Sequence, residues 1–154
     1  MNSFSAAREA LVVHLKEHAF RSDGPFTLRS GEVSNWYIDA RQTTFSGVGA
    51  RLVGEAVLEE VPPGVDGVGG MTMGADPIAV ATAVVAALHG SDLVSFSVRK
   101  EAKVHGIGGR LVGPVSEGSR VVVLEDTTTT GSALVAAIDA LREAGVEVVK
   151  AVAL

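Results

Sequence analysis

One segment of this chain must be a strand that is buried on both faces, and it constrains the fold more than any other. Residues 121–124 are three valines and a leucine in succession. A half-exposed strand alternates polar and apolar residues, so an uninterrupted, mainly β-branched run is typical of a parallel strand covered on both sides by helices. The run ends in two carboxylates, Glu125 and Asp126, and four threonines follow. The sequence predicts a buried strand with a polar carboxyl end.

Strands and helices alternate through the second half of the chain. The expected strands are 67–71, 93–98, 120–124 and 146–154, and the expected helices are 76–88 and 132–144. We expect Asp76 to cap the first of these helices, Pro77 to begin it, and Gly145 to end the second. This alternation predicts an α/β fold, a parallel sheet flanked by helices and joined by right-handed crossovers, with 120–124 as the central strand.

The first sixty residues have a different pattern. Helical spacing of apolar residues predicts helices at 5–18 and 45–60, and two strands at 26–28 and 35–40 are expected to pair as a hairpin. His14 and His18 have the spacing of metal ligands, but no third ligand accompanies them, which favours an ordinary solvated helix face. We expect one domain over residues 1–154, with 1–40 mostly forming a small hood and 41–154 an α/β core.

Composition narrows the class of protein. A chain of 154 residues with 47% hydrophobic and 20% charged residues is globular and long enough for one real core. The absence of cysteine excludes disulfides and suits a reducing cytoplasm, and neither a secretory signal nor a membrane-length apolar run is visible. The net charge of −5 argues against general nucleic-acid binding, so any anion site must be local.

The polar residues after the buried strand suit a sugar phosphate. Hydroxyl side chains and the N-terminus of the following helix suit a phosphate group, while Glu125 and Asp126 suit ribose hydroxyls or Mg²⁺. Threonines also cap helices and fill turns, and the two carboxylates taken alone could be a solvated strand end. Neither a Walker P-loop nor a complete dinucleotide-binding glycine motif is present. The order of these residues favours a sugar-phosphate site.

Two further loops could bind anions. The glycine-rich residues 69–74 are either a tight turn that needs positive φ or a backbone that closely approaches a diphosphate. We expect residues 99–119 to form a flexible loop rich in glycine. Its first part contains four cationic side chains and only one carboxylate, Glu101, and it also contains His105. A solvated charged loop is possible, but we favour a lid that closes over an anionic ligand and excludes water.

These residues together resemble a known family. Residues 121–132 are similar to the 5-phosphoribosyl 1-diphosphate (PRPP) binding motif of type I phosphoribosyltransferases. Residues 99–106, Arg-Lys-Glu-Ala-Lys-Val-His-Gly, resemble the catalytic loop of the orotate phosphoribosyltransferases. Residues 26–31 and 36–39 resemble the N-terminal segment that covers the orotate site in that family. The resemblance spans nearly the whole chain and implies the type I phosphoribosyltransferase fold.

The resemblance also implies an activity. A pentosyltransferase of this family exchanges the pyrophosphate of PRPP for the ring nitrogen of orotate, giving orotidine 5′-monophosphate in the de novo synthesis of UMP. Two alternatives stay open at this point. One is a phosphoribosyltransferase for another base, because the PRPP motif does not select the base. The other is a regulatory protein that binds PRPP or a nucleotide without catalysis.

Site residues follow by matching positions to the family's motifs. The catalytic residues implied are Lys103, His105 and Asp126, and those lining orotate are Tyr37, Ile38 and Thr129. The PRPP-binding residues implied are Arg29, Thr72, Arg99, Lys100, Lys103, His105, Glu125, Asp126, Thr127, Thr128, Thr129, Thr130, Gly131, Ser132 and Ala133. Mg²⁺ is expected to be carried by PRPP, without a direct protein site. The resemblance further implies a homodimer whose loop residues reach the neighbouring subunit's active site.

The chain departs from the family pattern at a few positions. Arg29 and Met73 stand where many members have lysine, although the sequence around Met73 resembles a subgroup of the family. Members usually continue beyond the position of Leu154 with a further strand and helix, which begin with an Asp-Arg pair whose arginine contacts orotate. Two alternatives stay open at this point: a shortened form of a longer chain, or a minimal natural form.

Overall fold

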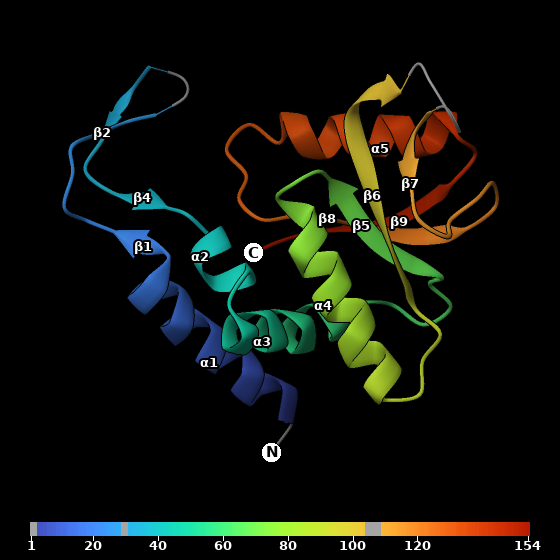
Figure 1. Cartoon of the computed structure of the whole chain (residues 1–154), viewed down its shortest axis with the longest axis horizontal. Coiled ribbons are helices and arrows are strands. Elements are labelled where there is room, and N and C mark those ends of the chain that lie inside the picture. The colour runs from blue at the N-terminus through green and yellow to red at the C-terminus, as the bar shows by residue number, and fades with distance from the viewer. Residues whose placement is uncertain (1–2, 29–30, 104–108) are drawn as a thin grey trace.

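A five-stranded sheet forms the centre of the computed structural model, which describes residues 3–28, 31–103 and 109–154 (Figure 1). The strand order is β7 (Gly109–Val112), β6 (Val94–Lys103), β5 (Gly67–Met71), β8 (Arg120–Glu125) and β9 (Glu147–Ala153). Strands β6, β5, β8 and β9 are parallel, and β7 pairs antiparallel with β6. The α/β prediction is confirmed, except that the middle strand is β5 and β8 lies beside it.

Helices cover both faces of the sheet, as the apolar run required. Helix α5 (Ser132–Glu143) packs on one face, and α4 (Ala75–Leu88) packs on the other with α3 (Gly47–Leu58) against it. Successive residues of β8 point alternately into these two cores. Val121 and Val123 belong to the cluster with α5, whereas Val122 and Leu124 belong to the cluster with α3 and α4. All four side chains are almost fully buried.

Helix α1 (Ser3–His18) belongs to the core layer more than to a hood. It packs on α3, and its Leu11 is buried in the same cluster as α3 and α4. The predicted helix at 45–60 begins later, at Gly47, because the Ser46 hydroxyl accepts a hydrogen bond from the Gly49 N–H and caps it. The short helix α2 (Arg41–Thr44), which sequence reasoning missed, precedes this cap.

The hood consists of four strands of two residues each, which stand to one side of the sheet at the left of Figure 1. They pair as β1 (Phe20–Arg21) with β4 (Tyr37–Ile38) and β2 (Phe26–Thr27) with β3 (Val33–Ser34). The predicted hairpin between 26–28 and 35–40 is therefore wrong. The Ser34 hydroxyl donates to the Trp36 carbonyl at 2.7 Å and accepts from the Trp36 N–H at 3.2 Å. These bonds close a turn that separates β3 from β4.

Two other predicted boundaries are wrong. Asp76 does not cap α4, because the helix begins at Ala75 after Gly74, and Pro77 is its third residue. Residues 99–119 are not a continuous loop: β6 extends through Lys103, and β7 returns beside it. Charged residues at 99–103 concealed the strand because they replace the apolar pattern that predicts one.

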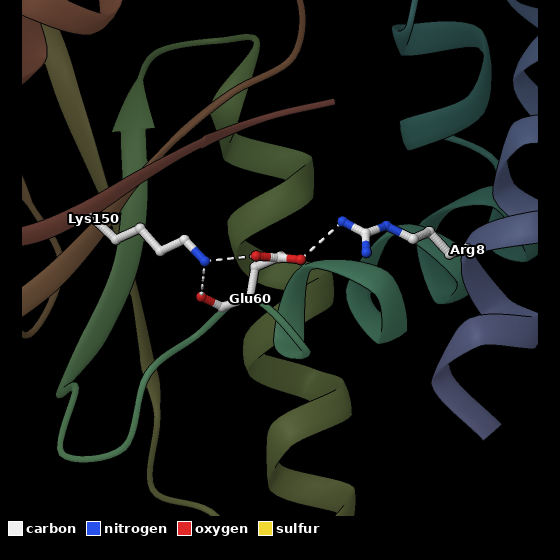
Figure 2. A network of polar contacts seen from close by, with 3 residues as sticks. All are labelled: Arg8, Glu60 and Lys150. Carbon is white, nitrogen blue, oxygen red and sulfur yellow. Dashed lines mark hydrogen bonds and ion pairs between the residues drawn. The ribbon is translucent and has the colours of Figure 1, made fainter. Parts of the chain in front are cut away.

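A three-residue ionic network joins the N-terminal helix to the last strand (Figure 2). Glu60, just after α3, contacts Arg8 Nη2 of α1 through Oε1 at 2.8 Å and Lys150 Nζ of β9 through Oε2 at 2.5 Å. Lys150 Nζ also donates to the Glu60 carbonyl at 2.9 Å. Hydrogen bonding and charge from Lys150, followed by smaller effects of Arg8, lower the pKa of Glu60 below its ordinary value of 4.5.

Replacing Glu60 should destabilise the fold in a pH-dependent way. A depressed carboxyl pKa contributes stability above pH 4.5, and this stability is lost as the pH falls through the native pKa. We expect Glu60→Gln to lower the free energy of unfolding at pH 7 by about 1 kcal/mol, because the network is partly exposed. Urea unfolding at pH 7 and pH 3 measures this, with exposed Glu9→Gln as the control. A deficit that stayed the same at pH 3 would contradict the ionic origin.

Candidate active site

Two carboxylates end β8, and they have different environments. Glu125 is 7% exposed, whereas Asp126 is half-buried and its Oδ1 accepts the Thr127 N–H at 2.8 Å. Burial, together with hydrogen bonding and charge from Asp126, raises the pKa of Glu125 from 4.5 to about 7. Glu125 is thus a carboxyl group that changes charge near neutral pH. Such a group beside a cavity is typical of functional sites.

The polar loop after β8 surrounds a cavity of about 540 Å³. Its lining consists of Glu125, Thr127, Thr128, Thr129, Thr130, Gly131, Ser132 and Ala133, eight of the residues predicted to bind PRPP. Gly131 adopts φ +75°, a left-handed conformation that glycine adopts without a steric penalty. Helix α5 starts at the next residue, so the first N–H groups of the helix have no intrahelical partner and favour an anion.

The glycines of residues 69–74 are required by close packing. Residues 72–74 do form a tight turn between β5 and α4, but none of Gly69, Gly70 and Gly74 has positive φ, so the predicted need for positive φ is wrong. A Cβ on Gly70 would lie 2.1 Å from the Leu124 carbonyl oxygen of β8, and one on Gly74 would lie 2.5 Å from Asp126 Oδ1. The glycines therefore let the loop after β5 lie directly against the carboxylates that end β8. A close approach to a diphosphate stays a prediction.

Thr72 has both of its hydrogen-bond donors engaged inside the protein. Its hydroxyl donates to Asp76 Oδ2 at 2.6 Å, and its N–H donates to the Val98 carbonyl at 2.9 Å. The Thr72–Met73 peptide bond is cis, and the Met73 side chain is exposed. Within the part of the chain that the structure describes, the N–H groups of Met73 and Gly74 make no hydrogen bond. These backbone donors are thus available to an anion, whereas the Thr72 hydroxyl is already engaged.

A second cavity, of about 320 Å³, adjoins the first and brings the predicted base-binding residues together. Its lining consists of Leu28, Ser34, Trp36, Tyr37, Ile38, Thr127, Thr128, Thr129 and Leu154. Tyr37, Ile38 and Thr129, which are distant in sequence, thus meet at one pocket. The three threonines line both cavities, so a ligand could extend from one into the other. Trp36 was missed, although a tryptophan beside Tyr37 in the sequence could have indicated it.

The predicted cationic lid is only partly described. Arg99 is half-buried and Lys100 is exposed on β6, and the Arg99 carbonyl accepts a hydrogen bond from Arg110 Nε at 2.8 Å. Arg29, His105 and the side chain of Lys103 lie outside the described residues, and the lid stays a prediction.

Arg41 is a cation that sequence reasoning missed. Its Nε donates to Asp39 Oδ1 at 2.7 Å. Its pKa is raised mainly by Asp39 and slightly by Tyr37 and Asp126, which indicates that it lies near the site.

No group of three side chains that could hold a metal ion occurs among the described residues. His14 Nδ1 instead lies 3.1 Å from Thr43 Oγ1, and its ring lies 4.3 Å from that of His18. Within the described part of the chain, no helix is both long and apolar enough to cross a membrane.

Comparison with known proteins agrees with this geometry. A family model described as the phosphoribosyl transferase domain matches residues 70–154, which include β8 and its polar loop. The fold and site therefore define a phosphoribosyltransferase.

The relatives identify the family more closely. The orotate phosphoribosyltransferase of Streptomyces avermitilis is 46% identical over 143 residues, which cover 92% of this chain and 78% of that protein. The Mycobacterium tuberculosis orotate phosphoribosyltransferase solved with Fe(III) dicitrate superposes with a TM-score of 0.82 at 34% identity, covering 96% of this chain and 83% of that one. The same enzyme in complex with PRPP gives a TM-score of 0.78 at 30% identity, covering 96% and 82%. This chain belongs to the orotate phosphoribosyltransferase family.

The raised pKa of Glu125 predicts that the affinity for PRPP depends on pH. If the ionised carboxylate accepts hydrogen bonds from the ribose hydroxyls, protonation must weaken binding. With a pKa of about 7, the ionised fraction falls about tenfold from pH 8 to pH 6, and the affinity for PRPP should fall by the same factor. Titration calorimetry across this range measures the change. Glu125→Gln is the control, because it lacks this carboxyl group and retains the titration of PRPP and of every other group of the protein.

The raised pKa of Glu125 must also make the stability of the ligand-free protein depend on pH. Between pH 4.5 and about 7, native Glu125 keeps a proton that the unfolded chain has lost, so stability should fall as the pH rises through this window. Glu125→Gln should abolish that component of the pH dependence. A wild-type profile identical to that of the variant in both binding and stability would refute the raised pKa.

Proposed function

We propose that this protein transfers the 5-phosphoribosyl group of PRPP to orotate, giving orotidine 5′-monophosphate and pyrophosphate in pyrimidine nucleotide synthesis. The main support is the pair of adjoining cavities. One is lined by Glu125 and residues 127–133 and suits a ribose phosphate, and the other is lined by Tyr37, Ile38 and Thr129 and suits a flat base. Threonines 127–129 line both cavities, which supports a product that extends from one into the other.

The transfer breaks the bond from the ribose anomeric carbon to the pyrophosphate oxygen and forms one to the ring nitrogen of orotate. Positive charge develops on the ribose, and negative charge develops on the departing pyrophosphate. We assign Glu125 and Asp126 to the ribose hydroxyls, and the hydroxyls of residues 127–132 with the N-terminus of α5 to the 5′-phosphate. From the resemblance of residues 99–106, we assign Arg99, Lys100, Lys103 and His105 to the leaving group, where cations lower the barrier most.

Mg²⁺ belongs to the proposal as an ion that PRPP carries. Bound to substrate oxygens, it would neutralise part of the pyrophosphate charge. Hard carboxylate and hydroxyl oxygens line this end of the sheet at Glu125, Asp126 and Thr127, so the donor set suits such an ion. We further propose that the reaction takes place in the cytoplasm, which suits a chain without cysteine.

One assay tests the substrate. Purified protein mixed with PRPP and Mg²⁺ should consume orotate, seen as loss of its ultraviolet absorbance, and should not convert adenine, hypoxanthine or uracil. Turnover of one of those bases in place of orotate would assign the enzyme to another base. PRPP binding in calorimetry without turnover of any base would identify a regulatory protein and refute the proposed enzyme.

We also propose that the protein is a homodimer. Large apolar side chains are exposed together on α3 and α4 and in the turn before them: Phe45, Val48, Val80, Val84 and Leu88. Most of them line an apolar groove of about 530 Å³. Exposed apolar patches of this kind are typical of protein–protein interfaces. Met73, in the loop between β5 and α4, is a further exposed apolar side chain.

A charge on this surface should separate the subunits. Val84→Glu should convert the dimer to a monomer at micromolar concentration in sedimentation experiments and reduce turnover, because a buried unpaired charge is strongly unfavourable at an interface. Val13→Glu is the matched control, since Val13 on α1 is 54% exposed and Val84 is 55% exposed. A wild-type protein that is monomeric and fully active would overturn the shared-site proposal.

A further inference from the structure

The pocket proposed for the base contains an aromatic side chain that is not among the residues matched to orotate. Trp36 lines this pocket together with Tyr37, Ile38 and Thr129, and 54% of its surface is exposed. An indole buries more apolar surface than most side chains, so leaving it half-exposed in a cavity wall forgoes stabilisation. The exposure is explained if a flat ligand covers the ring when it binds.

The rest of the hood holds Trp36 in place. Phe20 of β1 pairs with Ile38 of β4, and its ring stacks on that of Trp36 with centroids 6.3 Å apart and planes inclined by 26°. Trp36 and Ile38 are two residues apart, the spacing that puts side chains on one face of an extended segment. The two hydrogen bonds between Ser34 and the Trp36 backbone fix the segment from the other side. The indole is therefore positioned before any ligand arrives.

We propose that Trp36, braced by Phe20, is a specificity-determining residue whose indole stacks on the flat face of the base. The inference rests on the proposed function and adds a recognition element to it. A planar conjugated base offers a face for stacking, whereas PRPP has no aromatic ring. The cavity suited to the ribose phosphate is lined by Glu125 and residues 127–133, and Trp36 is not among its lining residues. Changes at Trp36 should consequently affect the base and spare PRPP.

Trp36 is the only tryptophan of the chain, so its fluorescence reports on this position alone. Adding orotidine 5′-monophosphate, or orotate with pyrophosphate, should shift and quench the emission of the whole protein in a saturable way. PRPP with Mg²⁺ should leave the emission nearly unchanged. Free tryptophan at the same absorbance corrects for light absorbed by the base. An emission that no base or nucleotide changes after this correction would overturn the proposal.

Kinetics separate stacking from a structural role. Trp36→Ala should raise the KM for orotate by about tenfold, the size expected for a lost base-stacking contact. The KM for PRPP, the kcat and the melting temperature should stay close to wild type. Trp36→Phe should recover most of the affinity for orotate, because a phenyl ring still offers a face to the base. Val13→Ala changes an equally exposed apolar side chain outside this pocket and outside the proposed subunit interface, and it should leave the KM for orotate unchanged.

The outcomes distinguish this inference from the function it rests on. If the wild type converts another base but not orotate, the proposed substrate is wrong, and the inference holds only if that base quenches Trp36. If the wild type converts orotate and Trp36→Ala leaves its KM unchanged, the inference alone is wrong. Equal increases in the KM for orotate and for PRPP, or equal losses in the Ala and Phe variants, would also overturn it.

Discussion

The parallel pairing of β5 with β8 is the constraint on which the active site depends. These strands lie so close that Gly70, which pairs with Leu124, has no room for a Cβ beside the Leu124 carbonyl. A second close contact lies just beyond the ends of the two strands, where a Cβ on Gly74 would collide with the Asp126 carboxylate. Ligands in open α/β sheets bind beyond the carboxyl ends of the strands. Close packing of β5 and β8 therefore fixes the distance between the loops that the site requires.

Burial of β8 also determines the chemistry of its last residue. Glu125 follows four fully buried side chains at residues 121–124 of the strand, so its carboxyl group is desolvated, and its pKa rises to about 7. A carboxylate at that position costs stability at neutral pH, because the native state disfavours its charge. The valine and leucine side chains around it supply the apolar burial that offsets this cost. The core and the site are thus two consequences of the same strand.

The core could be predicted from the sequence, and the hood could not. Apolar runs and helical spacing located β8 and α5 because both elements bury whole faces over many residues. The hood strands have two residues each, too few for any periodicity, and their pairing depends on the side chain of Ser34. Asp76 followed by proline had the pattern of a helix cap, yet its carboxylate accepts the Thr72 hydroxyl from inside the first turn. Contacts between side chains override local patterns at each of these places.

The different construction of hood and core suits their different tasks. Backbone ladders of two residues contribute little, so the hood relies on side-chain pairs: Phe20 with Trp36, Phe26 with Tyr37, and Arg21 placed over the Phe26 ring. The residues that line the cavity of about 540 Å³ are fixed by the sheet and by the start of α5, whereas most of those that line the cavity of about 320 Å³ belong to the hood. A substitution in the hood can therefore alter the cavity proposed for the base without disturbing the core or the cavity proposed for the ribose phosphate. This separation offers a physical reason why one fold can serve several bases.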